Sequence, residues 1–159
     1  MKKIFLAFLI PLTFSSCVKT ILQNVDLEND KKKIQGAWHL KKIEIITNQN
    51  NYYGLDFLDG DFGFNEDGTL GFITAAGEAY RGTWSVNIKE TTTGCYTAPN
   101  GDQVCNTEWN HLLNLNVRQI NAQKTKTASF ESVTFQGDNN FKALIYVNYL
   151  TYMYYFERK

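Results

Sequence analysis

The sequence predicts an all-β protein, an antiparallel up-and-down barrel of eight strands. Short segments in which apolar and polar residues alternate follow one another from residue 34 to residue 159, as expected of strands with one buried face. Turn-forming clusters of Gly, Asn and Asp separate these segments, as in a series of β-hairpins. The 159 residues, of which 43% are hydrophobic and 14% aromatic, suffice for one packed domain.

The N-terminal segment resembles a bacterial export signal. Two lysines precede an apolar run over residues 4–14, and this run is shorter than the roughly 20 residues of a membrane-spanning helix. Residues 14–17, Phe-Ser-Ser-Cys, are similar to a lipobox, whose cysteine is diacylated and becomes the new N-terminus. The resemblance implies that residues 1–16 are a lipoprotein signal peptide and that Cys17 is lipidated. An ordinary cleaved signal that ends beside a cysteine is the alternative.

The residues after Cys17 bear on the location and on the link to the domain. Val-Lys-Thr follows the cysteine, without an acidic residue. By resemblance to lipoprotein sorting rules, this favours the outer membrane, facing the periplasm. We expect residues 17–33 to be the lipidated cysteine and a short tether, with a short helix near residues 26–34 as the alternative. The lysines at 31–33 are interpreted as a solvated face, with lipid headgroups as the alternative partner.

The first strand carries Trp38 and Leu40 on one face, and Ile43 and Ile45 at the opposite parity. A one-residue shift swaps the two faces of a strand. We therefore expect a β-bulge or a sharp bend near residues 41–42.

A long connection and a tight hairpin come next. Residues 47–60 are polar and aromatic, and the aromatic side chains indicate that this connection packs on the domain, as a lid would. Phe62 and Phe64 then alternate with polar or small residues. Residues 66–69, Glu-Asp-Gly-Thr, predict a hairpin turn because Asp-Gly tolerates positive φ. A second short strand follows this turn.

The strongest strand pattern lies over residues 80–89. Its even positions form one face, namely Tyr80, Gly82, Trp84, Val86 and Ile88. Five matches to a period of two are difficult to obtain from a helix. Gly82 lies between two aromatic residues of this face, which predicts a close backbone approach or a kink at a barrel corner.

The polar segment over residues 91–110 is expected to be a loop that contains Cys95 and Cys105. The compartment implied by export is oxidising, so a disulfide across the turn-rich residues 99–102 is expected. Closing so short a loop stabilises a protein by about 2–3 kcal/mol. A metal site is the alternative, but two cysteines without histidines at ligand spacing suit it poorly.

The rest of the chain predicts four further strands in a meander, which brings the total to eight. Alternating or apolar segments cover residues 113–118, 129–136, 141–147 and 152–156, and polar turns cover residues 121–127, 137–140 and 148–151. The last two strands have apolar residues on both faces. This pattern predicts that they are central, or are covered by the first strand.

Two Gly-x-Trp motifs carry a resemblance to a known family. Gly36-x-Trp38 at the start of the meander is similar to the opening motif of lipocalins. With the second motif at residues 82–84 and the terminal residues 154–159, it resembles the lipocalin-like domain family of bacterial lipoproteins. The resemblance implies a lipocalin-like β-barrel domain over residues 34–159. It also implies that Arg158 stacks on Trp38, a cation–π contact worth about 0.5–2 kcal/mol, although Trp38 as a plug of the barrel floor is the alternative.

We predict no enzyme, cofactor or metal site. His39 and His111 have no Ser, Cys or Asp partner at a known spacing, so both are expected to be surface histidines. The acidic residues between 59 and 67 have a sufficient explanation as turn residues, with acid–base work or calcium binding as alternatives. The formal net charge is +0, which gives no indication of the basic stripe that nucleic acid requires.

Two function classes remain. The first is a membrane-anchored module whose barrel binds a small apolar ligand. Its candidate lining residues are Phe64, Phe72, Tyr80, Trp84, Leu113 and Leu115. The second is a structural or protein-interaction lipoprotein of the cell envelope, in which the same residues fill the barrel and an outer face or the disulfide loop docks on an envelope protein. An apolar cavity of roughly 300 Å³ or more favours the ligand, whereas a filled barrel with an exposed aromatic patch favours the partner.

Overall fold

The computed structural model describes residues 26–46 and 54–159. The predicted signal peptide over residues 1–16, Cys17 and the tether up to residue 25 lie outside the described residues. So do residues 47–53 of the long connection. Within the described ranges, no helix is long and apolar enough to span a membrane.

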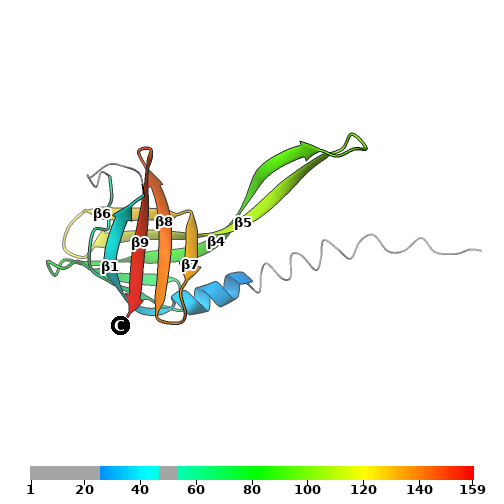
Figure 1. Cartoon of the computed structure of the whole chain (residues 1–159). Helices are drawn as coiled ribbons and strands as arrows, with labels where there is room; N and C mark the ends of the chain where they lie inside the picture. Colours follow the sequence, from blue (N-terminus) through cyan, green and yellow to red (C-terminus); the bar gives the residue numbers. More distant parts are fainter. Residues whose placement is uncertain (1–25, 47–53) are drawn as a thin grey trace, which may run out of the picture.

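Nine strands form one antiparallel sheet, preceded by a short helix over residues 26–34 (Figure 1). The strands are β1 (Gly36–Ile45), β2 (Asp61–Phe64), β3 (Thr69–Ile73), β4 (Ala79–Thr97), β5 (Gln103–Gln119), β6 (Thr125–Phe130), β7 (Ser132–Phe135), β8 (Asn140–Val147) and β9 (Leu150–Arg158). Their order in the sheet is β6-β5-β4-β3-β2-β1-β9-β8-β7. The prediction of an antiparallel all-β domain is therefore confirmed.

The expected eight-stranded closed barrel is not what the sheet forms. The sheet has two ends, β6 and β7, which are consecutive in the chain but do not pair with each other. The segment predicted as one strand over residues 129–136 is divided at Glu131, whose backbone N–H donates to the Leu144 carbonyl at 2.7 Å. The chain thus leaves the edge of β5 and joins β8. Residues 121–127 were predicted as a turn, but β6 already begins at Thr125.

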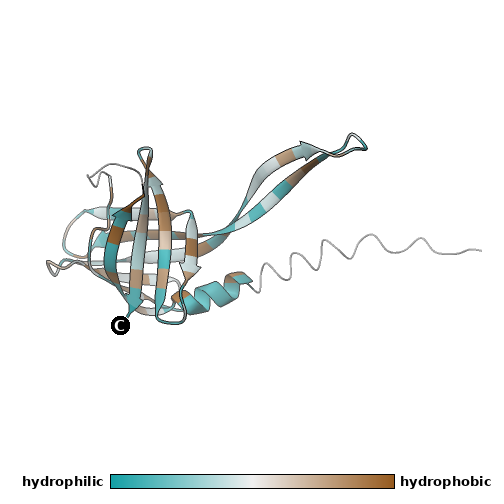
Figure 2. Ribbon diagram, in the orientation of Figure 1, coloured by the Kyte–Doolittle hydropathy of each residue, from teal (hydrophilic) through white to brown (hydrophobic). Residues whose placement is uncertain are grey.

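The sheet curls around a single aromatic core. In Figure 1 the β1, β9, β8 and β7 part crosses over the β4, β5 and β6 part. Phe130 of β6 contacts Tyr154 and Phe156 of β9 with ring centroids 5.0 and 6.3 Å apart, although these strands are not neighbours in the sheet. Apolar residues recur along β1, β8 and β9 (Figure 2), and no polar or charged residue is buried in the described part of the chain.

The helix and the first strand close one side of this core. Ile34 at the end of the helix is fully buried, and its carbonyl accepts a hydrogen bond of 2.6 Å from Trp38 Nε1. The helix over residues 26–34 thus replaces an extended spacer in that part of the tether. In β1 the pairing with β9 shifts register between Leu40 and Lys42, which confirms the predicted bulge.

The segment predicted as a loop over residues 91–110 is instead mostly strand. β4 and β5 stay paired from Tyr80 opposite Gln119 to Thr97 opposite Gln103, and their outer half projects from the rest of the fold as a two-stranded ribbon (Figure 1). The prediction was wrong because alternation of apolar and polar residues reports burial of one face. In this half of the two strands no residue is buried, so no alternation exists.

Candidate functional site

All six candidate lining residues lie in the core, where they pack against one another. Each is at most 7% exposed. Phe64 meets Trp84 edge to face with centroids 5.4 Å apart, and Phe72 lies 5.5 Å from Tyr80. Aromatic rings at these separations are in favourable contact. The residues predicted to line a pocket therefore fill the interior.

Phe57, from the described end of the long connection, adds to this filling. Its ring lies 4.9 Å from that of Phe72, and its carbonyl accepts a hydrogen bond of 2.9 Å from the Tyr154 hydroxyl. Burial raises the pKa of that hydroxyl, so it stays a donor. Asp56 accepts a hydrogen bond of 2.7 Å from the Thr127 backbone N–H on the edge of β6. The prediction that aromatics of this connection pack on the domain is confirmed for Phe57.

A cleft remains beside this segment, between β6 and the β8–β9 hairpin. Its volume is about 300 Å³, and Phe57, Ala128, Ile145 and Tyr154 form the apolar part of its wall. Leu55 and Val147 also line it, and the polar part of the wall includes Asp56, Thr127, Ser129 and Glu131. The cleft thus reaches the volume expected of a ligand site, but its wall is mixed.

Trp38 and Arg158 form the contact that the family resemblance implied. The guanidinium lies 4.4 Å from the centre of the buried Trp38 ring. It also donates to the carbonyls of Lys33 at 2.8 Å, Gln35 at 3.0 Å and Asp138 at 3.0 Å. Arg158 therefore joins the end of the helix, the last strand and the β7–β8 turn, which is a structural role.

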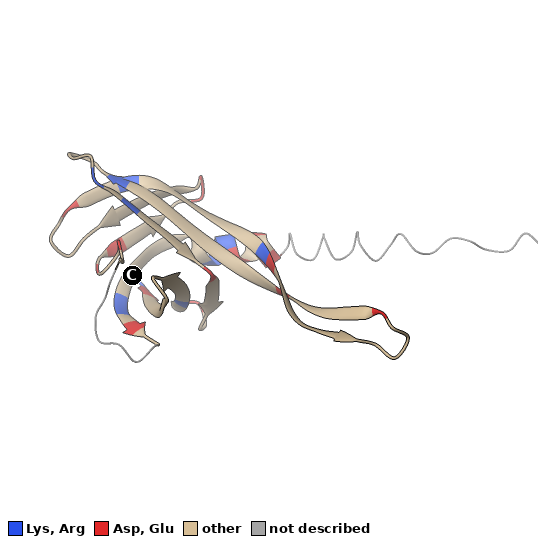
Figure 3. Ribbon diagram, turned by 90° about the horizontal axis from the view of Figure 1, so that it is seen from above, with Lys and Arg blue, Asp and Glu red and all other residues tan. Residues whose placement is uncertain are grey.

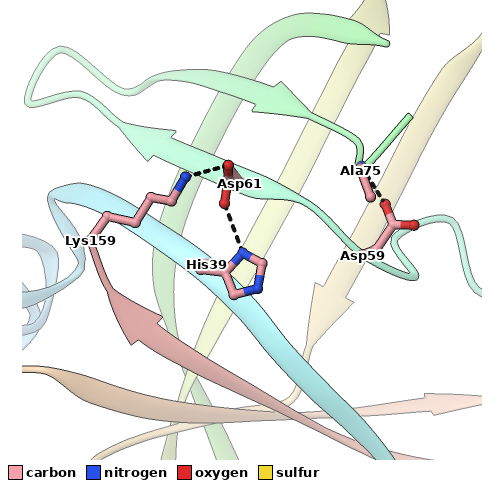
Figure 4. Close-up of polar contacts among 5 residues, drawn as sticks. All are labelled: His39, Asp59, Asp61, Ala75 and Lys159. Carbon is pink, nitrogen blue, oxygen red and sulfur yellow. Dashed lines mark hydrogen bonds and ion pairs between the residues drawn. The ribbon is translucent and has the colours of Figure 1, made fainter. Parts of the chain in front are cut away.

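The two histidines are bound by carboxylates rather than free on the surface. His39 Nδ1 lies 2.8 Å from Asp61, which also accepts from Lys159, as Figure 4 shows. These two contacts, chiefly that with Lys159, lower the pKa of Asp61. His111 on β5 pairs with Asp30 on the helix. Both partners are distant in sequence, so no spacing rule would have found them.

The acidic cluster near residues 59–67 disperses in the structure. Asp59 accepts the Ala75 N–H at 3.0 Å, apart from the Asp61 group (Figure 4). Asp67 accepts the Thr69 N–H at 2.9 Å and shapes the predicted hairpin turn. The described residues contain no group of three or more His, Cys, Asp or Glu side chains that could hold a metal ion.

The outer half of β4 and β5, residues 90–97 and 103–109, forms what we call the ribbon. β3 pairs with β4 only as far as Thr83, and β6 pairs with β5 only from Leu113. In the sheet, each ribbon segment therefore has only the other as a neighbouring strand. Cys95 and Cys105 lie opposite each other and form a disulfide, which confirms the predicted pairing. A turn follows, closed by the Ala98 N–H on the Asp102 carbonyl at 2.7 Å.

The surface of the ribbon differs in chemistry from the rest of the domain. Between Lys89 and Arg118 the sequence has no Lys or Arg, and Figure 3 shows no basic residue along the projecting strands. Tyr96 and Val104 face each other in register and are 58% and 38% exposed. Trp109, at the base of the ribbon, is 36% exposed.

Sequence reasoning placed the disulfide correctly but missed these three residues. They were assigned to a loop, where an exposed aromatic residue indicates nothing. One signal was available: Thr91-Thr92-Thr93 is a run of β-branched residues, which favours a strand even without alternation.

The chain has no significant match to a family model, to a curated protein or to a solved structure. The site must therefore be interpreted from its own geometry.

Proposed function

We propose that this protein is a lipid-anchored protein of the cell envelope that binds another protein through the ribbon. The ribbon itself is the observation on which this proposal depends. Its two strands extend beyond the neighbouring strands, and the Cys95–Cys105 disulfide joins them. None of the ribbon's side chains is buried. An element held in one conformation in this way loses little conformational entropy when it binds.

The envelope location rests on the N-terminal segment. The lipobox-like residues 14–17 imply acylation of Cys17, and two or three acyl chains suffice for stable anchoring. The sequence after Cys17 favours the outer membrane, facing the periplasm. A disulfide in the domain supports an oxidising compartment.

The filled core supports a scaffold role for the rest of the domain. A sheet order that follows the chain, with β6 and β7 as consecutive ends, is also compatible with the lipocalin-like barrel of the family resemblance. In that interpretation the barrel supplies rigidity, and the ribbon supplies recognition. The ribbon surface has no basic residue and carries Glu90 and Glu108, so it suits a protein partner better than nucleic acid.

A photo-crosslinking amino acid at Tyr96 tests the proposal in cells that express the full-length chain. The matched control is the same substitution at Tyr146, which is 62% exposed but lies on β8. We expect a discrete cross-linked adduct from position 96 and none from position 146. Absence of an adduct at position 96, or equal adducts at both positions, would contradict the proposal.

A second candidate function is the binding of a small apolar ligand, supported by the cleft of about 300 Å³ beside Phe57 and Tyr154. Native mass spectrometry of the purified full-length chain distinguishes the two. If the domain is only a scaffold, the measured mass should equal that of the chain with its acylated N-terminal cysteine, with nothing else bound. A co-purified apolar molecule that is lost on Ile145→Ala, in the wall of the cleft, and retained when only Tyr96 is changed to Ala, would favour the ligand.

A further inference from the structure

The outer face of strands β1 to β4 carries a trough, apart from the ribbon and from the cleft beside Phe57. Its volume is about 450 Å³, and the residues that line it include Ala37, Gly63, Gly71, Ile73, Arg81 and Ile120. Ala37 pairs with Gly63 in the sheet, and Gly63 pairs with Gly71. A Cβ at Gly71 would have no atom within 4 Å. This row of three strands is therefore open on its outer face.

Two exposed isoleucines form the apolar border of the trough. Ile73 pairs with Ala79 in the sheet, and the Ile120 backbone N–H donates to the Ala79 carbonyl at 3.0 Å. The two isoleucines thus lie on either side of the short Ala79 side chain, and they are 51% and 58% exposed. Covering them with an apolar molecule would be favourable.

A pair of arginines ends the open row. Arg81 lines the trough and pairs in the sheet with Gly71 on one side and with Arg118 on the other. Both arginines are exposed, and like charges directly opposite each other are unfavourable. In the described part of the chain, no ion pair joins either arginine to an acidic side chain. An anion bound between the two guanidinium groups would remove this repulsion.

The remaining charges leave the arginine end of the trough positive. Lys159 and Asp61 line the opposite end and form an ion pair of 2.5 Å, so they neutralise each other. Between Glu108 and Glu131 the sequence has no acidic residue, whereas this segment carries three basic residues, Arg118, Lys124 and Lys126. The trough thus combines an apolar surface with one positively charged end.

We propose that the trough binds an amphipathic anion, an apolar molecule that ends in a carboxylate or a phosphate. The anionic group lies at Arg81 and Arg118, because guanidinium groups donate paired hydrogen bonds to both kinds of anion. The apolar part lies over Gly63 and Gly71 and against Ile73. The volume of the trough is within the range of small-molecule sites. The site does not involve the ribbon, so its failure would leave the proposed function unchanged.

Photoaffinity labelling tests the site in the full-length chain, held in a maltoside detergent. The probes are dodecyl chains that carry a diazirine and end in a carboxylate, a phosphate or a trimethylammonium group. With one or both anionic probes we expect adducts on the peptides that contain Ile73 and Ile120, mapped by mass spectrometry. The two anionic probes distinguish a carboxylate ligand from a phosphate ligand. Equal labelling by the cationic probe, or no adduct on these peptides, would overturn the proposal.

Arginine variants test the role of the charge. In the Arg81→Gln, Arg118→Gln double variant, labelling by the anionic probe should fall by about tenfold or more. Lys89→Gln is the matched control, because Lys89 is also exposed on β4 but pairs with Glu131 at 2.7 Å, outside the trough. The double variant relieves the repulsion between the arginines, so its denaturation midpoint should not fall. Equal labelling of the double variant and the wild type would contradict the site.

Competition experiments on the wild-type chain test the apolar part of the site. An excess of dodecanoate or dodecyl phosphate should abolish labelling, whereas inorganic phosphate should reduce it far less, because it cannot cover the isoleucines. Equal competition by inorganic phosphate would refute the apolar contribution. Ile145→Ala, in the cleft beside Phe57, should leave labelling unchanged. Loss of labelling in that variant would place the molecule in the cleft and overturn the assignment to the trough.

Discussion

We call the domain without the ribbon the body. The ribbon and the part of β4 and β5 that lies in the body, residues 79–89 and 110–119, belong to one ladder of paired residues but are stabilised by different means. In the body the two strands lie between β3 and β6, and Trp84, Leu113 and Leu115 are buried. In the ribbon neither strand has a second neighbouring strand, and a disulfide and a tight turn join the two. A two-stranded hairpin alone is marginally stable in water. The comparison indicates that the ribbon depends on local bonds, whereas the body depends on its aromatic core.

The largest expected effect comes from truncating a core aromatic residue. The Phe156 ring lies 4.3 Å from that of Phe141 and 5.5 Å from that of Phe62, so Phe156→Ala should lower the free energy of unfolding by about 3–5 kcal/mol. Tyr96→Ala in the ribbon should change it by less than about 0.5 kcal/mol. Guanidinium denaturation of the oxidised chain measures both values. Equal losses of unfolding free energy in the two variants would contradict the comparison, because Tyr96 of the ribbon would then stabilise the fold as much as a core residue does.

Two glycines of β4 should be sensitive for different reasons. A Cβ at Gly82 would lie 1.9 Å from the Asn116 carbonyl oxygen and 2.7 Å from the Val117 Cα, which confirms the predicted close approach. Gly82→Ala should therefore cost about 3 kcal/mol, the upper part of the range for overpacking. At Gly94 no atom lies closer than 3.8 Å, but φ is +56°, so Gly94→Ala should cost about 1 kcal/mol through the backbone alone.

Asparagine separates these two explanations, because it tolerates the left-handed region better than alanine. Gly94→Asn should restore most of the stability that Gly94→Ala loses, whereas Gly82→Asn should be at least as harmful as Gly82→Ala. The denaturation midpoint reports the stability of the body, and amide hydrogen exchange reports the local stability of the ribbon. Rescue by asparagine at position 82 would exclude the steric explanation.

Removing the disulfide should affect the ribbon more than the body. In the Cys95→Ser, Cys105→Ser double variant, the free energy of local opening of the ribbon should fall by about 2–3 kcal/mol. Hydrogen exchange at residues 90–97 and 103–109 detects this loss as faster exchange. The denaturation midpoint of the body should shift little, since its core does not contact the disulfide. A large shift of the body would indicate that the two halves unfold together.

The sequence predicted the body better than the ribbon, and the same physical difference is the reason. Alternation identified β1 with its bulge and the body half of β4, because one face of each is buried there. Alternation failed for the ribbon and for Thr125–Ala128 in β6. In these segments no face is buried, so burial does not impose an alternating pattern. The Cys95–Cys105 disulfide was predictable from the turn that it closes. The partners of His39 and His111 were not, because they depend on long-range pairing and on the docking of the helix.

The smallest expected effect concerns ion pairs, which among the described residues lie outside the ribbon because the ribbon has no basic residue. Lys159 and His39 lower the pKa of Asp61 from its ordinary value of 3.8. A carboxyl whose folded-state pKa is depressed stabilises the fold above its unfolded pKa and loses that contribution as the pH falls through the folded value. At neutral pH and low salt, Asp61→Asn should therefore cost about 0.5 kcal/mol, since the group is largely exposed and screened by solvent.

This difference between wild type and Asp61→Asn should be constant above about pH 5, shrink as the pH falls below 3.8 and disappear at lower pH. High salt at neutral pH should also reduce it, because salt screens exposed charges. Denaturation at several pH values, with and without added salt, measures both trends. A difference that persisted in acid would show that Asp61 acts through the packing of its side chain and not through its charge.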